Sequence, residues 1–292
     1  MEQPNRPRRL ALREGDLADA AKRYHEALEL FQRLGEPASE AVVQHQLGKA
    51  FWQANQLERA EQHFREAARL KEERGNLAEA AITWNALAVV SEQAGKLDVA
   101  ETWYRKAIGG HRDWPKELSV DLRNLAGLLR TQPGRLDEAR ELAEQSLAIK
   151  KTLDPGAAEI WKIYGLLADI ADQQSQPDRA AEYRRLAREA KRNFAGTAHE
   201  MKGHLPVILG TFQAIHDPDT ADDFRTALSQ MEKHGWTNLV AAIRRILAGE
   251  RNEQALCAPL DLEDSMIIET ILRAIADPTT LSALLPSEDA AE

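Results

Sequence analysis

The sequence predicts an all-α fold, an α-solenoid of stacked antiparallel helix pairs that continues into a C-terminal helical block. A small alanine recurs in steps of 40, 40, 39 and 41 residues, at Ala20, Ala60, Ala100, Ala139 and Ala180. A helix breaker stands five residues before each alanine, at Gly15, Asn55, Gly95, Gly134 and Ser175. Such a period indicates tandem supersecondary units. Hydrophobic residues make up 43% of the chain and aromatic residues only 5%, which suits helices packed through small side chains.

The first pair is expected to be incomplete. Pro4 and Pro7 leave only a short helical piece at Leu10 to Arg13, and a helix should follow the turn at Gly15, from Leu17 to Leu30. Either a degenerate capping helix begins the stack, or the chain is cut from a longer protein. We favour the second explanation.

Four further pairs follow with apolar residues at helical spacing. In the third, WNALAVVSEQAGKLDVAETWYRKAI, the first helix presents Trp84, Leu87 and Ala88, and the second presents Ala100, Tyr104 and Ala107. The fourth has a turn one residue longer, TQPGR, and in the fifth Arg184 stands in the aromatic column. Breakers between pairs recur at Gly35, Gly75, Pro115 and Pro155.

These columns resemble the tetratricopeptide repeat, whose first helix carries Trp, Leu-Gly and Tyr and whose second carries Ala, an aromatic and Ala. The unit is about forty rather than thirty-four residues long. It therefore looks like the extended repeats of kinesin light chain and of cell-polarity adaptors, with NLAGLLRTQPGRLDEA, Asn124 to Ala139, as the nearest match. The resemblance covers roughly residues 10–195. It implies a right-handed superhelix that serves as a scaffold for protein binding.

Three regions are expected. Residues 1–195 should form four to five helix pairs, residues 196–286 a helical block that caps the stack, and residues 287–292 a disordered acidic tail. The last helix of the block should begin at Asp261 as an N-terminal cap and end before Pro278.

Charge and composition narrow the function classes. The formal net charge is −9, which disfavours general attraction to nucleic acid or to an anionic membrane. Cys257 is the only cysteine, so no internal disulfide forms. Since no apolar run reaches the length of a signal peptide or a membrane span, we expect a soluble, cytoplasmic protein.

No credible catalytic set, cofactor site or metal site is present. The histidines of HEMKGH, His199 and His204, are five residues apart rather than four, so they diverge on a helix and Gly203 weakens it further. There is no GxxxxGK[ST] phosphate loop and no GxSxG elbow. The sequence therefore predicts a protein that is not an enzyme.

In a stack of this kind the concave groove is lined by the first helices. The residues that should face it are His45, Gln46, Lys49, Gln53, Asn85, Val89, Glu92, Arg123, Asn124, Gly127, Arg130, Lys162 and Asp169. In the extended repeats it resembles, an asparagine at the place of Asn124 can bond a ligand backbone in both directions. Arg123 and Arg130, seven apart on one helix, could meet a carboxylate. For each residue taken singly, a solvated polar helix face is an equally good interpretation.

The leading hypothesis is a non-catalytic interaction module, a scaffold or adaptor that binds a peptide or helix of a protein partner in the groove. The alternative is the sensor or regulatory arm of a larger bacterial signalling protein, such as an NTPase switch or a caspase-like protease. An enzyme acting through the C-terminal block is the least favoured. The identity and polarity of the partner and the oligomeric state stay open.

Overall fold

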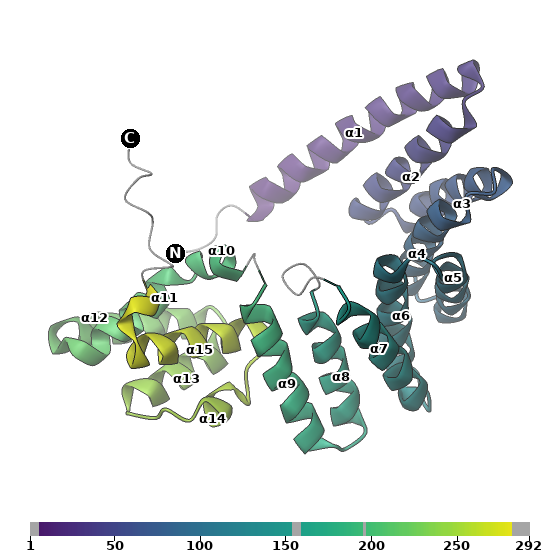
Figure 1. Ribbon diagram of the computed structural model, residues 1–292. Helices are drawn as coiled ribbons and strands as arrows, with labels where there is room; N and C mark the ends of the chain where they lie inside the picture. The colour runs from purple at the N-terminus through teal and green to yellow at the C-terminus, as the bar shows by residue number, and fades with distance from the viewer. Residues whose placement is uncertain (1–5, 154–158, 195–196, 282–292) are drawn as a thin grey trace. The chain divides into compact units, whose positions relative to one another are not determined.

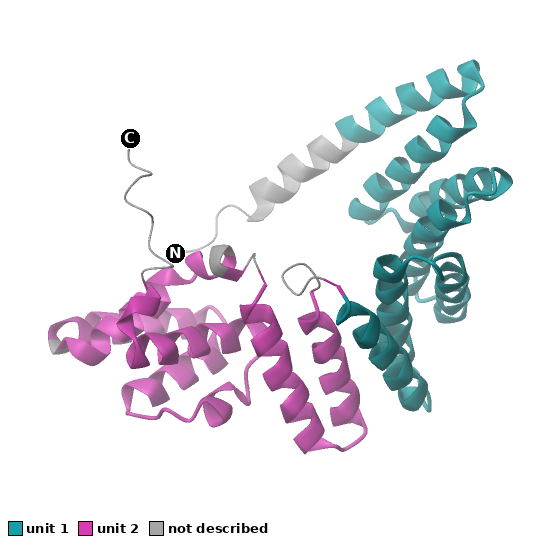
Figure 2. Ribbon diagram, viewed as in Figure 1, with its two compact units in different colours: residues 1–152 teal, residues 153–292 magenta. Residues whose placement is uncertain are grey.

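A computed structural model describes residues 6–153, 159–194 and 197–281, and the chain forms two compact units, residues 1–152 and 153–292 (Figure 2). The described residues contain helices and turns and no strand, which confirms the all-α prediction. The sequence places the domain boundary near residue 195, whereas the compact units meet at residue 152. Because compactness and repeat pattern are different criteria, the division at 195 stays a prediction. The acidic tail, 287–292, lies outside the described residues.

Seven helices belong to unit 1 (Figure 1). They are α1 (Arg6–Leu34), α2 (Pro37–Gln53), α3 (Leu57–Glu73), α4 (Leu77–Gln93), α5 (Leu97–Gly110), α6 (Pro115–Arg130) and α7 (Leu136–Lys150). Helices α2 and α3, α4 and α5, and α6 and α7 are the second to fourth pairs, and each new first helix packs on the preceding second helix.

The expected turn at Gly15 is wrong, because α1 runs through it as one helix. In the complete pairs, the two helices turn back on each other to bury facing apolar sides. Among the described residues, no separate partner helix precedes Gly15. A glycine inside a helix costs only about 1 kcal/mol relative to alanine, so good helix formers on both sides carry the helix through.

The turns inside the later pairs form where the breaker column predicts them. Asn55 and Gly95 have φ values of 57° and 73°, in the left-handed region. The next residue then closes the helix end: the amide of Gln56 donates to the carbonyl of Phe51 at 2.8 Å, and that of Lys96 to Ser91 at 2.9 Å. This is the hydrogen-bond pattern of the Schellman motif. Between pairs, Pro115 begins α6, where a missing amide hydrogen costs nothing, while Pro155 is outside the described residues.

Small residues let the paired helices approach closely. The column alanines Ala60, Ala100, Ala139 and Ala180 are completely buried, whereas Ala20 is only half-buried. On α2, Gly48 lies under the ring of Phe64, and a Cβ atom added there would sit 2.6 Å from the ring. The aromatic ring of the second helix thus fills the space that the glycine leaves on the first.

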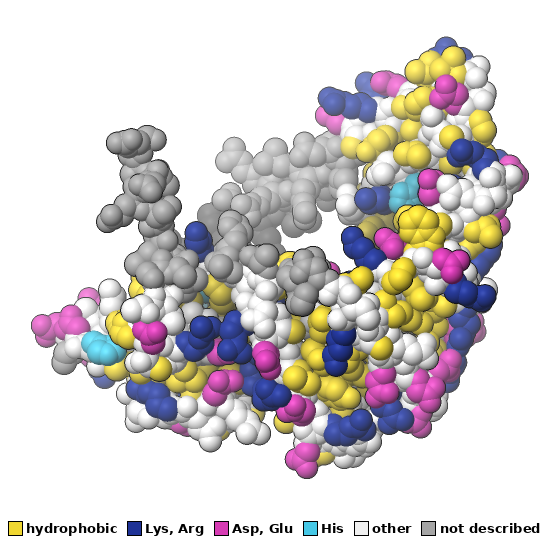
Figure 3. Space-filling model, in the orientation of Figure 1, with side chains coloured by type: hydrophobic (Ala, Val, Ile, Leu, Met, Phe, Trp, Pro, Cys, Tyr) yellow, Lys and Arg dark blue, Asp and Glu magenta, His cyan; other side chains and the backbone are white. Residues whose placement is uncertain are grey.

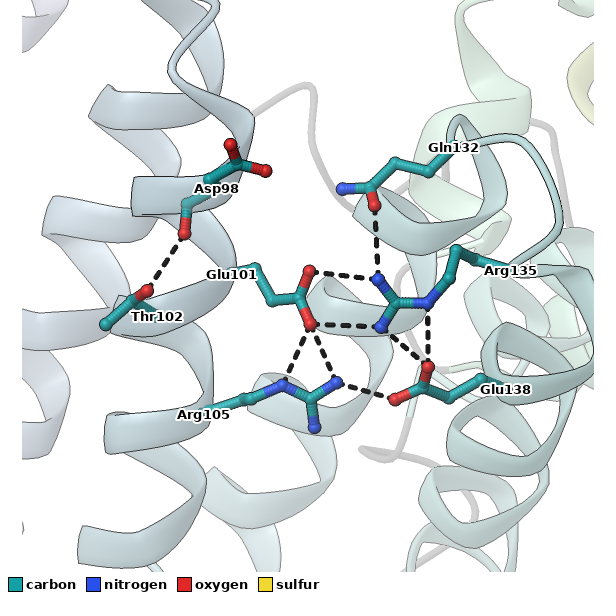
Figure 4. A network of polar contacts seen from close by, with 7 residues as sticks. All are labelled: Asp98, Glu101, Thr102, Arg105, Gln132, Arg135 and Glu138. Atoms are coloured by element: carbon teal, nitrogen blue, oxygen red, sulfur yellow. Dashed lines mark hydrogen bonds and ion pairs between the residues drawn. The ribbon is translucent and has the colours of Figure 1, made fainter.

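A ring of two arginines and two glutamates joins the third pair to the fourth (Figure 4). The Glu101 carboxylate of α5 accepts from Arg105 at 2.8 Å and from Arg135 at 3.0 Å. Glu138 of α7 accepts from the same two guanidinium groups, at 2.6 Å in each case. The arginines hold the pKa of both carboxyl groups below the usual range. One pair earlier, a single ion pair between Lys96 and Glu61, at 2.8 Å, occupies the equivalent place.

Unit 2 holds the fifth pair and the C-terminal block. Its elements are α8 (Trp161–Gln173), α9 (Pro177–Arg192), α10 (Thr197–Lys202), α11 (Leu205–His216), α12 (Pro218–Lys233), α13 (Thr237–Leu247), α14 (Glu253–Cys257), α15 (Leu262–Ala276) and the 3₁₀ turn η1 (Pro278–Leu281). Asp261 caps α15 as predicted, accepting from the Asp264 amide at 2.8 Å. Helix α15 packs on α9 and carries a fully buried side made of Ile267, Ile268 and Ile271.

Two glycine substitutions test the helix approach. We expect Gly48→Ala to destabilise the protein by about 1–3 kcal/mol, since its methyl group would overlap the Phe64 ring. Gly127→Ala in α6 is the matched control, because a Cβ atom there meets nothing within 4 Å, and it should raise stability by up to about 1 kcal/mol. Urea unfolding followed by circular dichroism measures both. Equal changes in the two variants would contradict the close packing of Phe64 on Gly48.

The ion-pair ring predicts a pH dependence. Because the arginines lower the pKa of Glu101 and Glu138, the ring stabilises the protein fully above the unfolded pKa of about 4.3 and is lost as the pH falls through the lower folded values. The difference in unfolding free energy between the wild type and Glu101→Gln should therefore be largest near neutral pH and shrink in acid. Glu144→Gln, which removes an exposed carboxylate of α7, should show no such trend. A pH-independent difference for Glu101→Gln would refute the assignment.

Candidate functional site

The residues predicted to face the groove all lie on first helices. Eleven of the thirteen belong to unit 1, on α2, α4 and α6, and we call their common surface the first-helix face. Lys49 and Gln53 are exposed, and the other nine are half-buried. Lys162 and Asp169 are exposed on α8, which belongs to unit 2. That these residues line a groove and bind a partner stays a prediction.

Two asparagines link neighbouring first helices across this face. The Asn124 amide of α6 donates to Oδ1 of Asn85 on α4 at 3.3 Å, and Asn85 donates to Oδ1 of Asp121 at 2.5 Å. Arg123 donates to Oδ1 of Asn124 at 3.1 Å. An asparagine amide has two N–H donors and two acceptor lone pairs. Among the described residues, each amide therefore keeps one donor and one acceptor for a further partner.

A buried histidine pairs with Asp121, the last member of this series of hydrogen bonds. His111, the C-terminal cap of α5, is 2% exposed and places Nδ1 2.7 Å from Oδ2 of Asp121 and Nε2 3.0 Å from the carbonyl oxygen of Ala78. Since a carbonyl oxygen only accepts, Nε2 carries a hydrogen, and one further proton lies in the bond to Asp121. Burial raises the pKa of Asp121, while the hydrogen bond from His111 opposes that rise.

The hydrogen bonds that join Asn85, His111 and Asp121 form a polar bridge between helices. An equivalent bridge occurs one pair earlier with different residues. Lys71, at the end of α3, donates to Oγ1 of Thr83 at 3.0 Å, and Thr83 lies 3.2 Å from Nδ1 of His45. Burial lowers the pKa of Lys71. Burial, together with the charges of Lys71 and Lys49, lowers the pKa of His45 to about 4, so its ring is neutral at pH 7. Each bridge thus joins a first helix, the end of the following second helix and the next first helix.

These bridges were missed in the sequence, although it carried a signal for them. A basic residue recurs in steps of 40, 39 and 41 at the end of each second helix, at Lys71, His111, Lys150 and Lys191. Lys71, His111 and Lys150 are at least nine-tenths buried. Lys191 pairs with Glu200 at 2.5 Å and lies 4.6 Å from the Trp161 ring centroid. Buried basic residues need polar partners, so basic residues that recur at the repeat period predict polar partners that recur at the same period. This recurrence was the signal in the sequence.

Other predicted groove residues take part in local contacts. Glu92 accepts from the hydroxyl of buried Tyr104 at 2.9 Å, and burial with this carboxylate raises the pKa of the phenol. Lys162 pairs with Glu159 at 2.6 Å. Arg123 and Arg130 stand on α6 seven residues apart, both half-buried. The face therefore combines fixed polar groups with partly exposed cations.

Metal-ligating side chains, the cysteine thiol and the hydrophobicity of the helices bear on the chemistry that the described residues could support. Over the described ranges, no group of three or more His, Cys, Asp and Glu could hold a metal ion, and the side chain of His199 falls outside those ranges. Burial raises the pKa of the Cys257 thiol to about 11, so it is protonated at neutral pH. None of the described helices has the length and apolar character needed to cross a membrane. Positive and negative side chains are interspersed on the visible surface (Figure 3).

The stacked helix pairs and the polar first-helix face together define a helical-repeat scaffold. Residues 9–73 and 79–152, just under half of the chain, match the family model described as tetratricopeptide repeat. Such repeats generally mediate protein–protein interaction, and the scaffold is generally non-catalytic. No curated protein matches the sequence.

Several solved structures are similar to the chain. The crystal structure of BtubC (BKLC) from P. vanneervenii is 22% identical, with a TM-score of 0.57 over 62% of this chain and 75% of that chain, and it supports the fold. A putative kinesin light chain from Podosopora anserina with nearly identical TPR-like repeats is 20% identical, with a TM-score of 0.47 over 65% of this chain and 97% of that chain. The Rap conjugation gene regulator of plasmid pLS20, solved with the Phr* peptide, is 17% identical, with a TM-score of 0.46 over 94% of this chain and 75% of that chain.

The bridge between His111 and Asp121 can be tested by replacing its residues with those of the equivalent bridge one pair earlier. His111→Ala leaves the buried Asp121 carboxylate with only the hydrogen bond from Asn85 and should cost about 3–5 kcal/mol. The double variant His111→Lys/Asp121→Thr copies the Lys71 and Thr83 bridge and should lose clearly less stability in urea unfolding. A double variant no more stable than His111→Ala would show that the two bridges are not equivalent.

Proposed function

We propose that the chain is a non-catalytic interaction module that binds an extended segment of a protein partner on the first-helix face. In this proposal it acts in the cytoplasm as an adaptor, without nucleic acid or a membrane surface as partner. The observation that carries the proposal is the remaining donor and acceptor on Asn85 and on Asn124, whose amides are already oriented by Asp121 and Arg123. An extended backbone offers matching C=O and N–H groups, so each amide can pair with it twice.

The surroundings suit side chains of an extended segment. Val42 and Ile82 are 51% and 48% exposed, one helical turn before His45 and Asn85, on the same side of α2 and α4. Exposed branched side chains of this kind favour apolar contacts with a ligand. Lys49, Arg123 and Arg130 add positive charge, so a segment with carboxylates near its apolar residues fits best.

The other hypotheses gain no specific support. The regulatory-arm hypothesis rested on an incomplete first pair, and the continuous helix α1 neither supports nor opposes it. It stays a prediction, as does the absence of enzymatic activity.

Selection of peptides from a displayed random library on the intact chain supplies the ligand for a test. Fluorescence polarisation should show that Arg123→Glu/Arg130→Glu weakens binding of the selected acidic peptides about tenfold or more, through lost charge pairing. Gly127→Leu, which fills open space on the same face, should weaken binding sterically. Arg225→Glu, in α12 of unit 2, is the matched charge control. Unchanged affinity in the first two variants, with helical content intact, would show that the first-helix face is not the binding site.

A further inference from the structure

A cavity of about 370 Å³ lies inside unit 2, between the fifth helix pair and the start of α15. Its walls include Gly165 and Ala168 of α8, Arg184 and Arg188 of α9, and Leu262 of α15. The volume is in the range of small-molecule sites. Asp169 is the only one of the thirteen predicted groove residues in its lining, and no residue of the first-helix face takes part.

The wall of this cavity contains a guanidinium group that is poorly satisfied by the protein. Arg188 is only 8% exposed, and its Nη2 donates a hydrogen bond to the Glu253 carboxylate at 3.3 Å. Its Nε is buried and, among the described residues, has no hydrogen-bond partner. A guanidinium has five N–H donors, and burying it without acceptors is costly. Arg188 also borders a second cavity, of about 460 Å³.

The rest of the lining selects the kind of anion. Ala168, Ala187, Leu260 and Leu262 make much of the wall apolar. Arg184, the other cation, pairs with Asp172 outside the cavity, while Asp169 and Asp261 contribute carboxylates to the lining. These carboxylates oppose a doubly charged phosphate, whereas a singly charged carboxylate matches the planar fork of Arg188.

We propose that this cavity binds a carboxylate carried on a short apolar group, with Arg188 as the residue that pairs with the carboxylate. The apolar part lies against Ala168, Leu260 and Leu262. A peptide C-terminus and a free small carboxylic acid share this chemistry. The site lies in unit 2 and does not depend on the proposed role of the first-helix face in unit 1.

The intact chain, labelled with ¹⁵N, is titrated with hexanoate and with N-acetyl-leucyl-leucine, and the neutral controls are hexanamide and the peptide amide. The Arg188 Nε–Hε signal, identified by its loss in Arg188→Gln, is the readout. We expect it to move with at least one of the acids and to stay in place with both amides. Tighter binding of the peptide acid would point to a peptide C-terminus, and tighter binding of hexanoate to a small acid. No movement with either acid, or equal movement with the amides, would overturn the proposal.

A cavity-filling variant separates ligand binding from folding. A Cβ atom at Gly165 meets nothing within 4 Å, so Gly165→Leu fills the cavity while improving helix propensity. It should weaken binding of the acid by about tenfold or more at unchanged helical content. Arg188→Lys keeps the charge without the fork and should also bind more weakly.

Gly127→Leu is the matched control, since it adds the same side chain in open space on α6 of unit 1. It should leave acid binding unchanged while weakening the peptides selected for the first-helix face. The two glycine variants thus report failure of either proposal separately. Wild-type affinity of Gly165→Leu for the acid would show that the cavity is not the site.

Discussion

Close approach of paired helices through small side chains is the constraint on which the rest of the structure depends. Ala60, Ala100 and Ala139 are completely buried at successive contacts between helices, and Gly48 leaves room for the Phe64 ring. Larger residues would separate the two helices of a pair and shift the next first helix that packs on them. The ion-pair ring around Glu101 and the asparagine link across α4 and α6 both require that the helices keep this spacing.

The polar bridges connect this packing to the candidate binding face. His111 and Asp121 are buried, and their geometry fixes the amide of Asn85, which in turn accepts from Asn124. A buried polar chain of this kind is stable only when every member has a partner. In the proposed binding mode, a ligand would meet amides whose orientation is set in advance, which lowers the entropy lost on binding. The equivalent bridge through Lys71, Thr83 and His45 extends the same logic one pair earlier.

Sequence reasoning succeeded where local rules and the period agree. The left-handed turns at Asn55 and Gly95 and the Asp261 cap follow from nearest neighbours in the chain. Gly15 obeys the same column yet lies inside α1, because a breaker makes a turn only when the flanking helices can bury each other. The bridge from Asn85 to Asp121 joins residues 36 apart, so neither side chain identifies the other from its own surroundings.

By itself, the sequence determined that the chain is a stack of helix pairs and where most of its helices begin and end. These features depend on helical periodicity and on turn chemistry, both of which are determined by residues close together in the sequence. Only the tertiary structure decided which polar residues on the first helices are already hydrogen-bonded, and that Arg188 borders two cavities with few hydrogen-bond partners. Partner choice among buried polar groups depends on distances between helices that are far apart in the chain, and packing alone sets those distances.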